Sequence, residues 1–158
     1  EIGVLQTSEK NLVVRTSGLY GKGGDNFVHT IIRRARLGKP LRVVDDQVLS
    51  PTWTGSLAGA LVNLIEKEAS GIVHFCDVEG CSWYEFTETI LDEALGRGWI
   101  SAKPGLVAIK TTELQQSARR PPYSILDCTR YEKLTGMKRD SWQTTLHSYF
   151  DSCTEPPV

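Results

Sequence analysis

Short apolar runs alternate with amphipathic segments over the first two thirds of the chain. Residues 11–17, 41–45 and 71–76 contain β-branched clusters bordered by glycine or proline, a pattern that predicts buried strands. Each run precedes a segment in which apolar residues recur every three or four positions, which predicts a helix with one buried face. These repeated strand–helix alternations indicate an α/β fold with a mainly parallel sheet.

The predicted helices have capping residues at their starts and apolar stripes that face the core. The capping signals are Asp25 or Asn26 and two capping boxes, Ser82–Glu85 and Thr129–Glu132, and the turn Ser50–Thr52 precedes the second of these helices. The residues expected to face inward are Phe27, Val28, Ile31, Ile32, Ala35, Leu57, Leu61, Leu64, Ile65, Phe86, Ile90, Leu91, Ala94, Trp142, Leu146, Tyr149 and Phe150. Residues 18–24 are expected to form a loop, and 99–122 to be irregular apart from a short strand at 106–109.

The composition is that of an ordinary globular domain. The 158 residues are 40% hydrophobic and 23% charged, which excludes a collagen-like or disordered chain. Lys and Arg total 18 against 19 Asp and Glu, so the basic excess typical of non-specific nucleic-acid binding is missing and no nucleic-acid partner is expected. No apolar run approaches the ~18 residues needed to cross a membrane, so no membrane association is expected.

The cysteines and histidines do not predict a metal site. The four cysteines contain no C-x-x-C pair, so we expect reduced thiols in a cytoplasmic protein rather than a disulfide scaffold. His29, His74 and His147 have no second ligand at metal spacing. No bound metal is therefore expected.

Three glycines, Gly18, Gly21 and Gly24, spell G-x-x-G-x-x-G between a predicted strand and a predicted helix. The acidic pair Asp45-Asp46 follows about 21 residues later, which is close to a dinucleotide-binding fingerprint. However, charged residues interrupt the stretch where the fingerprint is apolar, and too few parallel strands follow it. An ordinary glycine-rich turn is favoured, and an anion site for another phosphate ligand stays open as an alternative.

Further motifs, taken in order, resemble one enzyme family. They are Arg15-Thr16-Ser17, Tyr20-Gly21, Gly24 to Phe27, Val43 to Gln47, Ser50-Pro51-Thr52, Gly71 to His74, Cys81 to Phe86, and Arg120-Pro121 with Ser124, Leu126 and Asp127. The chain is similar to the carboxy-terminal part of the dTDP-4-dehydrorhamnose reductases, which are extended short-chain dehydrogenases/reductases. The resemblance runs from Glu1 to about Phe150.

The resemblance implies a fold and an activity. The fold would be the C-terminal part of a Rossmann-like NAD(P)-binding fold together with the smaller sugar-nucleotide-binding subdomain. Residues 1–150 would form the substrate-binding part of the reductase domain and 151–158 a flexible tail. The activity would be NADPH-dependent reduction of dTDP-4-dehydro-L-rhamnose to dTDP-L-rhamnose, with this chain binding the dTDP-sugar.

The family's catalytic Tyr-x-x-x-Lys does not occur in this chain, because none of its five tyrosines has a lysine four positions later. No catalytic residue is therefore assigned. We expect the sequence to begin just after the catalytic segment, with the N-terminal cofactor-binding half, and most of the NADPH contacts, absent. The 158 residues alone are expected to show no reductase activity.

The resemblance also implies which residues of this chain contact ligands. The expected substrate-binding residues are Ser17, Asn26, Asp46, Gln47, Ser50, Thr52, Arg120 and Ser124, and the expected cofactor-binding residues are Arg15 and Thr16. Arg120 is the strongest candidate because a guanidinium fork suits a diphosphate, and Arg119 beside it could take its place. The alternative roles are an ion pair for Arg15, a helix cap for Asn26, and a simple strand-to-helix turn for Ser50–Thr52.

Position 18 departs from the family pattern, because glycine stands where the family usually has a tryptophan near the sugar. This departure leaves two other functions open. One is a non-catalytic regulatory or binding subunit on the same fold, and the other is a related nucleotide-sugar epimerase or reductase. A homodimer is the expected assembly of the full-length protein.

Overall fold

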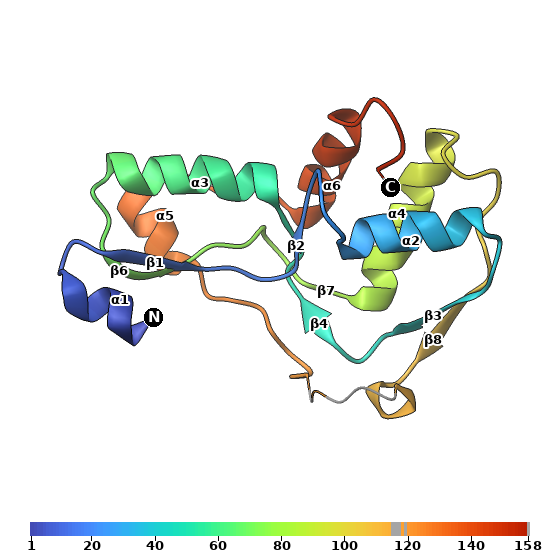
Figure 1. Ribbon diagram of the computed structural model, residues 1–158, viewed down its shortest axis with the longest axis horizontal. Helices are drawn as coiled ribbons and strands as arrows, with labels where there is room; N and C mark the ends of the chain where they lie inside the picture. The colour runs from blue at the N-terminus through green and yellow to red at the C-terminus, as the bar shows by residue number, and fades with distance from the viewer. Residues whose placement is uncertain (115–117, 119, 158) are drawn as a thin grey trace.

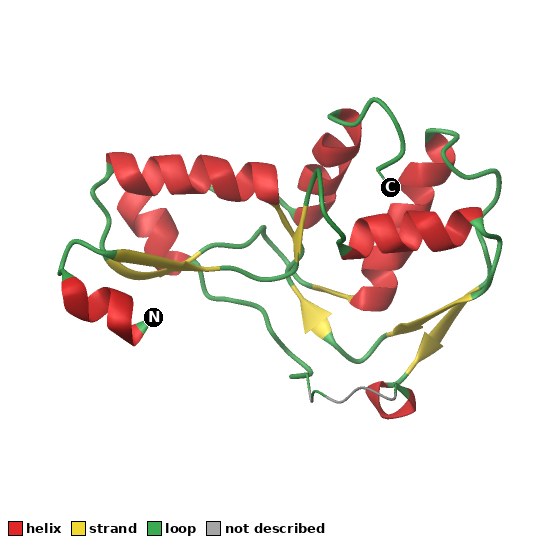
Figure 2. Ribbon diagram, viewed as in Figure 1, coloured by secondary structure: helices red, strands yellow, loops and turns green. Residues whose placement is uncertain are grey.

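Four pairs of short strands, surrounded by helices, make up the described part of the chain in a computed structural model, which covers residues 1–114, 118 and 120–157 (Figures 1 and 2). The helices are α1 (Ile2–Thr7), α2 (Phe27–Arg36), α3 (Thr54–Glu66), α4 (Trp83–Gly96), α5 (Thr129–Thr135), α6 (Trp142–Asp151) and the 3-10 helix η1 (Thr111–Glu113). The strands are β1 (Leu12–Arg15), β2 (Leu19–Tyr20), β3 (Leu41–Val44), β4 (Val48–Leu49), β5 (Thr52–Trp53), β6 (Gly71–His74), β7 (Cys81–Ser82) and β8 (Leu106–Ile109).

Three of these strand pairs are parallel, which confirms the α/β class. β1 pairs with β6, β2 with β5 and β3 with β8 in parallel, whereas β4 and β7 are antiparallel. In the described residues the pairs do not join into the single sheet that the sequence pattern predicts. The longest strands have only four residues, and the β1–β6 and β3–β8 pairs lie at opposite ends of the molecule (Figure 1).

Buried side chains form two hydrophobic clusters. The larger lies where α2, α4 and α6 meet β2 and β3, and includes Tyr20, Phe86 and Tyr149. The smaller lies between α3, α5 and β6 and includes Leu64, Val73 and Tyr131. Figure 2 shows the two groups of helices: α2, α4 and α6 surround the larger cluster, and α3 and α5 cover the smaller one. The inward stripes predicted for the first, third and last helices are confirmed.

The predicted stripe of the second helix is only partly correct. Leu64 on α3 is fully buried, but Leu61 is 36% exposed and Ile65 is 70% exposed. α3 packs mainly against α5, β5 and β6, so only the side of the helix that carries Ala60 and Leu64 is covered. Among the residues described, no helix combines the length and the apolarity needed to span a membrane.

Two of the three predicted helix caps are correct. The Asn26 Oδ1 accepts a hydrogen bond from His29 N at the start of α2, and Ser82 and Glu85 form a complete capping box at α4. The box expected at Thr129 is wrong, because Thr129 is the first residue of α5 rather than its cap. Asp127 serves this helix start instead, and its Oδ1 accepts from Thr129 N at 2.9 Å and from Thr129 Oγ1.

Helix α6 ends at Asp151, and Cys153 beyond it still packs against the larger cluster. The division into residues 1–150 and a flexible tail 151–158 stays a prediction. Val158 lies outside the described residues.

Phe86 is expected to be the most costly aromatic side chain to remove from the larger cluster. It is 1% exposed and packs against the rings of Tyr20, Phe27, Trp83 and Trp142. Phe86→Ala should lower the free energy of unfolding by about 3–5 kcal/mol, measured by urea denaturation. The control Leu37→Ala, at a position 66% exposed, should change it by less than about 0.5 kcal/mol. Equal losses for the two variants would contradict this account of the core.

An exposed histidine links α6 to α4 in a pH-dependent way. His147 Nδ1 lies 2.9 Å from Glu93 Oε1, and its Nε2 lies 3.5 Å from Asp151 Oδ2. The hydrogen bond and charge of Glu93, followed by the charge of Asp151, raise the pKa of His147, while Arg97 opposes them. A raised folded-state pKa means that the stabilisation is complete below the unfolded value of about 6.5 and is lost as pH rises through the folded value.

The difference in unfolding free energy between the wild type and His147→Gln should therefore be larger at about pH 5.5 than at about pH 8.5. Glu93→Gln should remove most of this pH dependence, because Glu93 is its largest cause. Denaturation curves at the two pH values test the expectation. If the difference in unfolding free energy between the wild type and His147→Gln were the same at both pH values, the His147–Glu93 pair would not contribute to stability.

Candidate functional site

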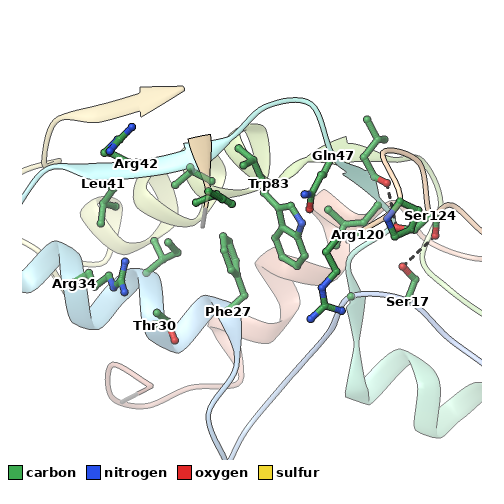
Figure 3. Close-up of a pocket in the computed structure, with 18 residues that line it drawn as sticks. Ser17, Phe27, Thr30, Arg34, Leu41, Arg42, Gln47, Trp83, Arg120 and Ser124 are labelled. Carbon is green, nitrogen blue, oxygen red and sulfur yellow. Dashed lines mark hydrogen bonds between the residues drawn. The ribbon is translucent and has the colours of Figure 1, made fainter. Parts of the chain in front are cut away.

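A cavity of about 600 Å³ opens between α2, β3 and residues 120–124 (Figure 3). Its lining residues that matter most for ligand chemistry are Ser17, Phe27, Thr30, Arg34, Arg42, Gln47, Trp83, Arg120 and Ser124. Ile31, Leu41, Val43 and Val44 supply an apolar wall. The cavity thus combines apolar surface with several polar and cationic side chains.

Four of the predicted substrate-binding residues meet in this cavity: Ser17, Gln47, Arg120 and Ser124. The Ser17 hydroxyl donates to Ser124 O at 3.3 Å, and the Ser124 hydroxyl donates to Val48 O at 3.2 Å. Gln47 is held from the other side, because its Nε2 donates to Thr111 Oγ1 at 3.0 Å. The structure therefore brings together residues that lie more than a hundred positions apart in sequence.

The other four predicted substrate-binding residues do not line the cavity. Asn26 caps α2 and also donates from Nδ2 to Gly21 O at 3.0 Å. The Ser50 hydroxyl donates to Glu79 O at 3.0 Å, and the Thr52 hydroxyl donates to Ser50 O at 3.3 Å. Both of these hydroxyls belong to fully buried residues, which matches the turn-forming alternative. Their assignment as ligand contacts stays a prediction.

Asp46 acts within the chain as well, by joining the turn after β3 to η1. Its carboxylate accepts hydrogen bonds from Thr111 N at 3.0 Å and from Thr111 Oγ1 at 2.6 Å. These bonds stabilise the ionised carboxylate and lower the pKa of Asp46. The neighbouring Gln47, which also bonds Thr111, is thereby fixed at the cavity wall.

The predicted cofactor residues lie at the carboxyl end of β1. Arg15 forms an ion pair with Glu1 at 2.6 Å, the alternative role that the sequence left open for it. Thr16 Oγ1 is buried and has no hydrogen-bond partner among the described residues. A buried hydroxyl without a partner is costly, so this atom suits a ligand that completes its hydrogen bonding.

Three residues of the cavity escaped prediction from sequence. Phe27 was expected in the core and Trp83 was not assigned to a site, yet both line the cavity, with their ring centroids 4.4 Å apart. Arg34 lies one helical turn after Thr30 on α2 and, in Figure 3, at the opposite end of the cavity from Arg120. The spacing of Thr30, Ile31 and Arg34 was the available signal, since residues three and four apart share one helix face.

Arg34 and Arg120 supply positive charge to the cavity, whereas Arg42 is paired with Glu113 at 3.1 Å. Neither Arg34 nor Arg120 has an ion-pair partner among the described residues, and no carboxylate occurs among the described lining residues. Arg119, the substitute considered for Arg120, lies outside the described residues. The described residues also hold no group of three or more His, Cys, Asp or Glu side chains placed to share a metal ion.

The segment 18–24 contains a strand that the sequence analysis missed, β2, between Gly18 and Gly21. Gly18 has φ +54, and a Cβ at this position would lie 2.7 Å from Leu49 Cδ1 and 3.1 Å from Ser50 O. The tryptophan that the resemblance implies at this position would therefore be strained in this backbone conformation. Next to this turn Thr52 N donates to Gly18 O at 3.1 Å, where the pairing of β2 with β5 begins.

The fold is part of a Rossmann-like α/β fold that recurs in nucleotide-sugar enzymes. A dTDP-4-dehydrorhamnose reductase from Bacillus anthracis, solved in complex with NADP, superposes with a TM-score of 0.82 at 34% identity, over 90% of this chain and 48% of that one. An orthologue from Clostridium acetobutylicum gives a TM-score of 0.79 at 33% identity, over 89% and 48% of the two chains. A UDP-glucuronic acid 4-epimerase from Bacillus cereus, only 16% identical, shares the fold with a TM-score of 0.68, over 89% and 44%.

The chain belongs to the RmlD substrate binding domain family, whose model matches residues 1–155. It is 36% identical to a dTDP-4-dehydrorhamnose reductase from Aggregatibacter actinomycetemcomitans, over 90% of this chain and 51% of that protein. It is 34% identical to a dTDP-4-keto-6-deoxy-D-glucose reductase from Streptomyces niveus, over 87% and 46%. The chain thus spans about half the length of the curated relatives it matches. The resemblance found in the sequence motifs is confirmed.

Gly18 gives a direct test of the tight turn beside the cavity. Gly18→Ala should lower the free energy of unfolding by more than about 1–2 kcal/mol, because the left-handed backbone and the contact with Leu49 both oppose a Cβ. Gly59→Ala is the matched control: Gly59 lies inside α3, an alanine Cβ there would meet no atom within 4 Å, and the change should stabilise that helix by up to about 1 kcal/mol. Thermal and urea unfolding measure both. A neutral Gly18→Ala would mean that the turn adopts another conformation.

Proposed function

We propose that the protein carrying this chain reduces dTDP-4-dehydro-L-rhamnose to dTDP-L-rhamnose with NADPH, and that this chain holds the sugar nucleotide. Two relatives named as reductases of dTDP-linked sugars, at 36% and 34% identity, support the substrate class. The observation that carries the proposal is the charge of the cavity. In a chain with a net charge of −1, the cavity lining contains three arginines and, among its described residues, no carboxylate.

This charge pattern suits a nucleoside diphosphate. Arginine presents a planar fork of donors that binds phosphate oxygens in pairs, and its charge persists at all physiological pH values. Arg120 and Arg34 are the two lining arginines without an ion-pair partner among the described residues, so both are available to an anionic ligand, from opposite ends of the cavity. We assign Arg120 to the diphosphate, as the family resemblance implies, and add Arg34 as a second cation of the same cavity.

The apolar part of the cavity suits the remaining portion of the ligand. The Phe27 and Trp83 rings and the wall formed by Val43 and Val44 offer a surface on which a pyrimidine base can pack. Thymine differs from uracil by one methyl group, which such a surface favours by roughly 1 kcal/mol. Ser17 and Ser124 then lie at the end of the cavity nearest β1, where hydroxyl groups suit a sugar.

The residues of this chain that we assign to the cofactor are Thr16 and Arg15, at the end of β1. The Thr16 hydroxyl, without a partner among the described residues, fits a polar group of NADPH, which supplies the hydride when bound. Arg15 is already neutralised by Glu1, so its contribution to the cofactor requires that ion pair to open. Ser17, the next residue, contacts the cavity segment, so β1 places the cofactor and sugar residues side by side.

A second function is favoured by one observation, the glycine at position 18. Because a large side chain would be strained in the backbone there, the apolar contact expected from a tryptophan near the sugar is missing. Such a site fits a binding or regulatory subunit that takes up a nucleotide without turnover. Turnover of the 4-keto sugar by the protein that carries this chain separates the two, and a preference for UDP over dTDP would indicate a related enzyme with a different sugar nucleotide.

The remaining assignments concern location and assembly. We place the protein in the cytoplasm, because its four cysteines are all free thiols in this fold. The balanced charge supports a protein without nucleic-acid partners. A homodimer of the full-length protein stays part of the proposal.

Binding of dTDP tests the cavity directly. Arg120→Ala should weaken dTDP binding about tenfold or more in isothermal titration calorimetry, because it removes a charge-assisted hydrogen bond to the diphosphate. Arg34→Ala should weaken binding less, because Arg34 lies at the other end of the cavity and attracts the nucleotide only through its charge. dTDP should bind more tightly than UDP. The protein that carries this chain should oxidise NADPH only when the 4-keto sugar nucleotide is present.

Arg36→Ala is the matched control, since Arg36 lies on the same helix, is exposed, and does not line the cavity. It should leave dTDP affinity unchanged. Undiminished affinity in both Arg120→Ala and Arg34→Ala would place the nucleotide elsewhere. Tight dTDP binding without any NADPH oxidation would favour the regulatory function over the reductase.

A further inference from the structure

Two cysteines that the proposed function does not use lie against each other in the interior. The Sγ atoms of Cys76 and Cys128 are 3.5 Å apart, although 52 positions separate the residues in sequence. Each residue is 1% exposed. Cys76 follows strand β6, and Cys128 immediately precedes α5, so the contact joins the end of a strand to the start of a helix.

The surroundings of the two sulfurs differ from those of the other buried cysteine. The Arg139 guanidinium donates to Cys76 O at 2.8 Å and lies 4.0 Å from Cys76 Sγ, while its Nε is bonded to Glu132 at 2.9 Å. A hydrogen bond from the Cys128 thiol, assisted by the charge of Arg139, lowers the pKa of Cys76. Burial without such partners instead raises the pKa of Cys81 to about 12.

We propose that Cys76 and Cys128 are a redox-active dithiol that a small hydroperoxide oxidises to an intramolecular disulfide. The Cys76 thiolate attacks one peroxide oxygen, the O–O bond breaks, and hydroxide or alkoxide leaves, so that Cys76 becomes a sulfenic acid. The Cys128 sulfur then attacks the Cys76 sulfur, the S–O bond breaks, and water leaves with the Cys128 proton. Two thiols and one hydroperoxide thus give one disulfide, one water and one water or alcohol.

The geometry needs only a local movement for this step. The two sulfurs must approach from 3.5 Å to the bonded distance of about 2.0 Å. The chain before Cys128 is irregular, and Leu126 O lies within 3.8 Å of Cys76 Sγ and within 3.6 Å of Cys128 Sγ, so the two thiols already share one backbone acceptor. We expect a shift of this irregular segment to bring the sulfurs together while β6 stays paired with β1. The same shift must admit the hydroperoxide, because both cysteines are 1% exposed.

The disulfide would fix the segment that forms one wall of the cavity. Ser124, four residues before Cys128, accepts a hydrogen bond from Ser17 through its carbonyl and donates from its backbone N to Val48 O at 2.9 Å. Residues 124–128 therefore join the cavity to the dithiol. That this wall contacts a sugar nucleotide rests on the proposed function, but the disulfide itself does not.

Hydrogen peroxide treatment of the purified protein, followed by peptide mass spectrometry without reduction, tests the proposal. The peptide containing Cys76 should be found cross-linked to the peptide containing Cys128, and dithiothreitol should release both. In Cys128→Ser the cross-link should vanish, and a dimedone adduct should appear on Cys76 instead. In Cys81→Ser and Cys153→Ser, the two controls, the Cys76–Cys128 cross-link should persist.

Hydrogen exchange of the oxidised and reduced forms measures the consequence for the cavity wall. Exchange in residues 120–128 should slow on oxidation in the wild type and stay unchanged in Cys128→Ser. Recovery of Cys76 and Cys128 as free thiols after peroxide treatment, or cross-links formed only between molecules, would overturn the proposal. Neither measurement uses a nucleotide, so a failure here is separate from a failure of dTDP to bind.

Discussion

Phe86 is buried among aromatic rings that belong to other elements, and the position of the cavity depends on this contact. Tyr20 comes from β2, Phe27 from the first turn of α2, and Trp142 from the first turn of α6, and each ring centroid lies within 5.8 Å of that of Phe86. Because α4 carries Phe86, this packing fixes α2 against α4 and leaves the adjoining face of α2, with Thr30 and Arg34, free to line the cavity. Phe27 takes part in both, since it packs on Phe86 and also faces the ligand space.

The polar side of the cavity is held by a different kind of interaction. Asp46 and Gln47 both bond Thr111, which ties the turn after β3 to the chain that follows β8. The Ser17–Ser124 and Ser124–Val48 bonds tie the far wall to β1 and β4. These are single hydrogen bonds rather than buried apolar contacts, so each contributes only about 1 kcal/mol. The aromatic cluster therefore fixes the position of the cavity, and these hydrogen bonds fix how far apart its polar walls lie.

Much of the fold could be predicted from local sequence signals. The periodicity of α2, α4 and α6 and the capping box at Ser82 are properties of neighbouring residues, and the structure confirms them. Some errors arise where a distant partner decides the outcome. Whether Ile65 is covered, for example, depends on which elements reach α3. The error at Thr129 is local instead, because α5 already begins at Thr129 and the nearby Asp127 accepts its hydrogen bonds. Strand β2 has only two residues and exists because β5 pairs with it.

The candidate site likewise contains residues that could be predicted from the sequence and residues that could not. Motif resemblance found Ser17, Gln47, Arg120 and Ser124 in the cavity, because these residues stand in recognisable order in the chain. It also included Ser50 and Thr52, whose hydroxyls bond the backbone of the chain itself, since a motif does not distinguish a residue that binds a ligand from one that shapes the turn beside it. Arg34 was missed because its spacing from Thr30 and Ile31 indicates only a shared helix face, and the cavity is needed to show that this face, rather than the one with Arg33 or Arg36, meets a ligand.

The segment from Arg120 to Cys128 connects the cavity to the Cys76–Cys128 dithiol, and each of these two sites combines residues that are far apart in the sequence. It begins at a cavity cation, contacts β1 and β4 through Ser124, and ends at a thiol that touches the end of β6. Its backbone is irregular apart from a bridge to Val48, whose N–H donates to Pro122 O and whose carbonyl accepts from Ser124 N. Few repeating hydrogen bonds therefore hold the segment, and none of residues 120–128 belongs to the aromatic cluster. For this reason the binding of a ligand can respond to this segment while the core stays as it is.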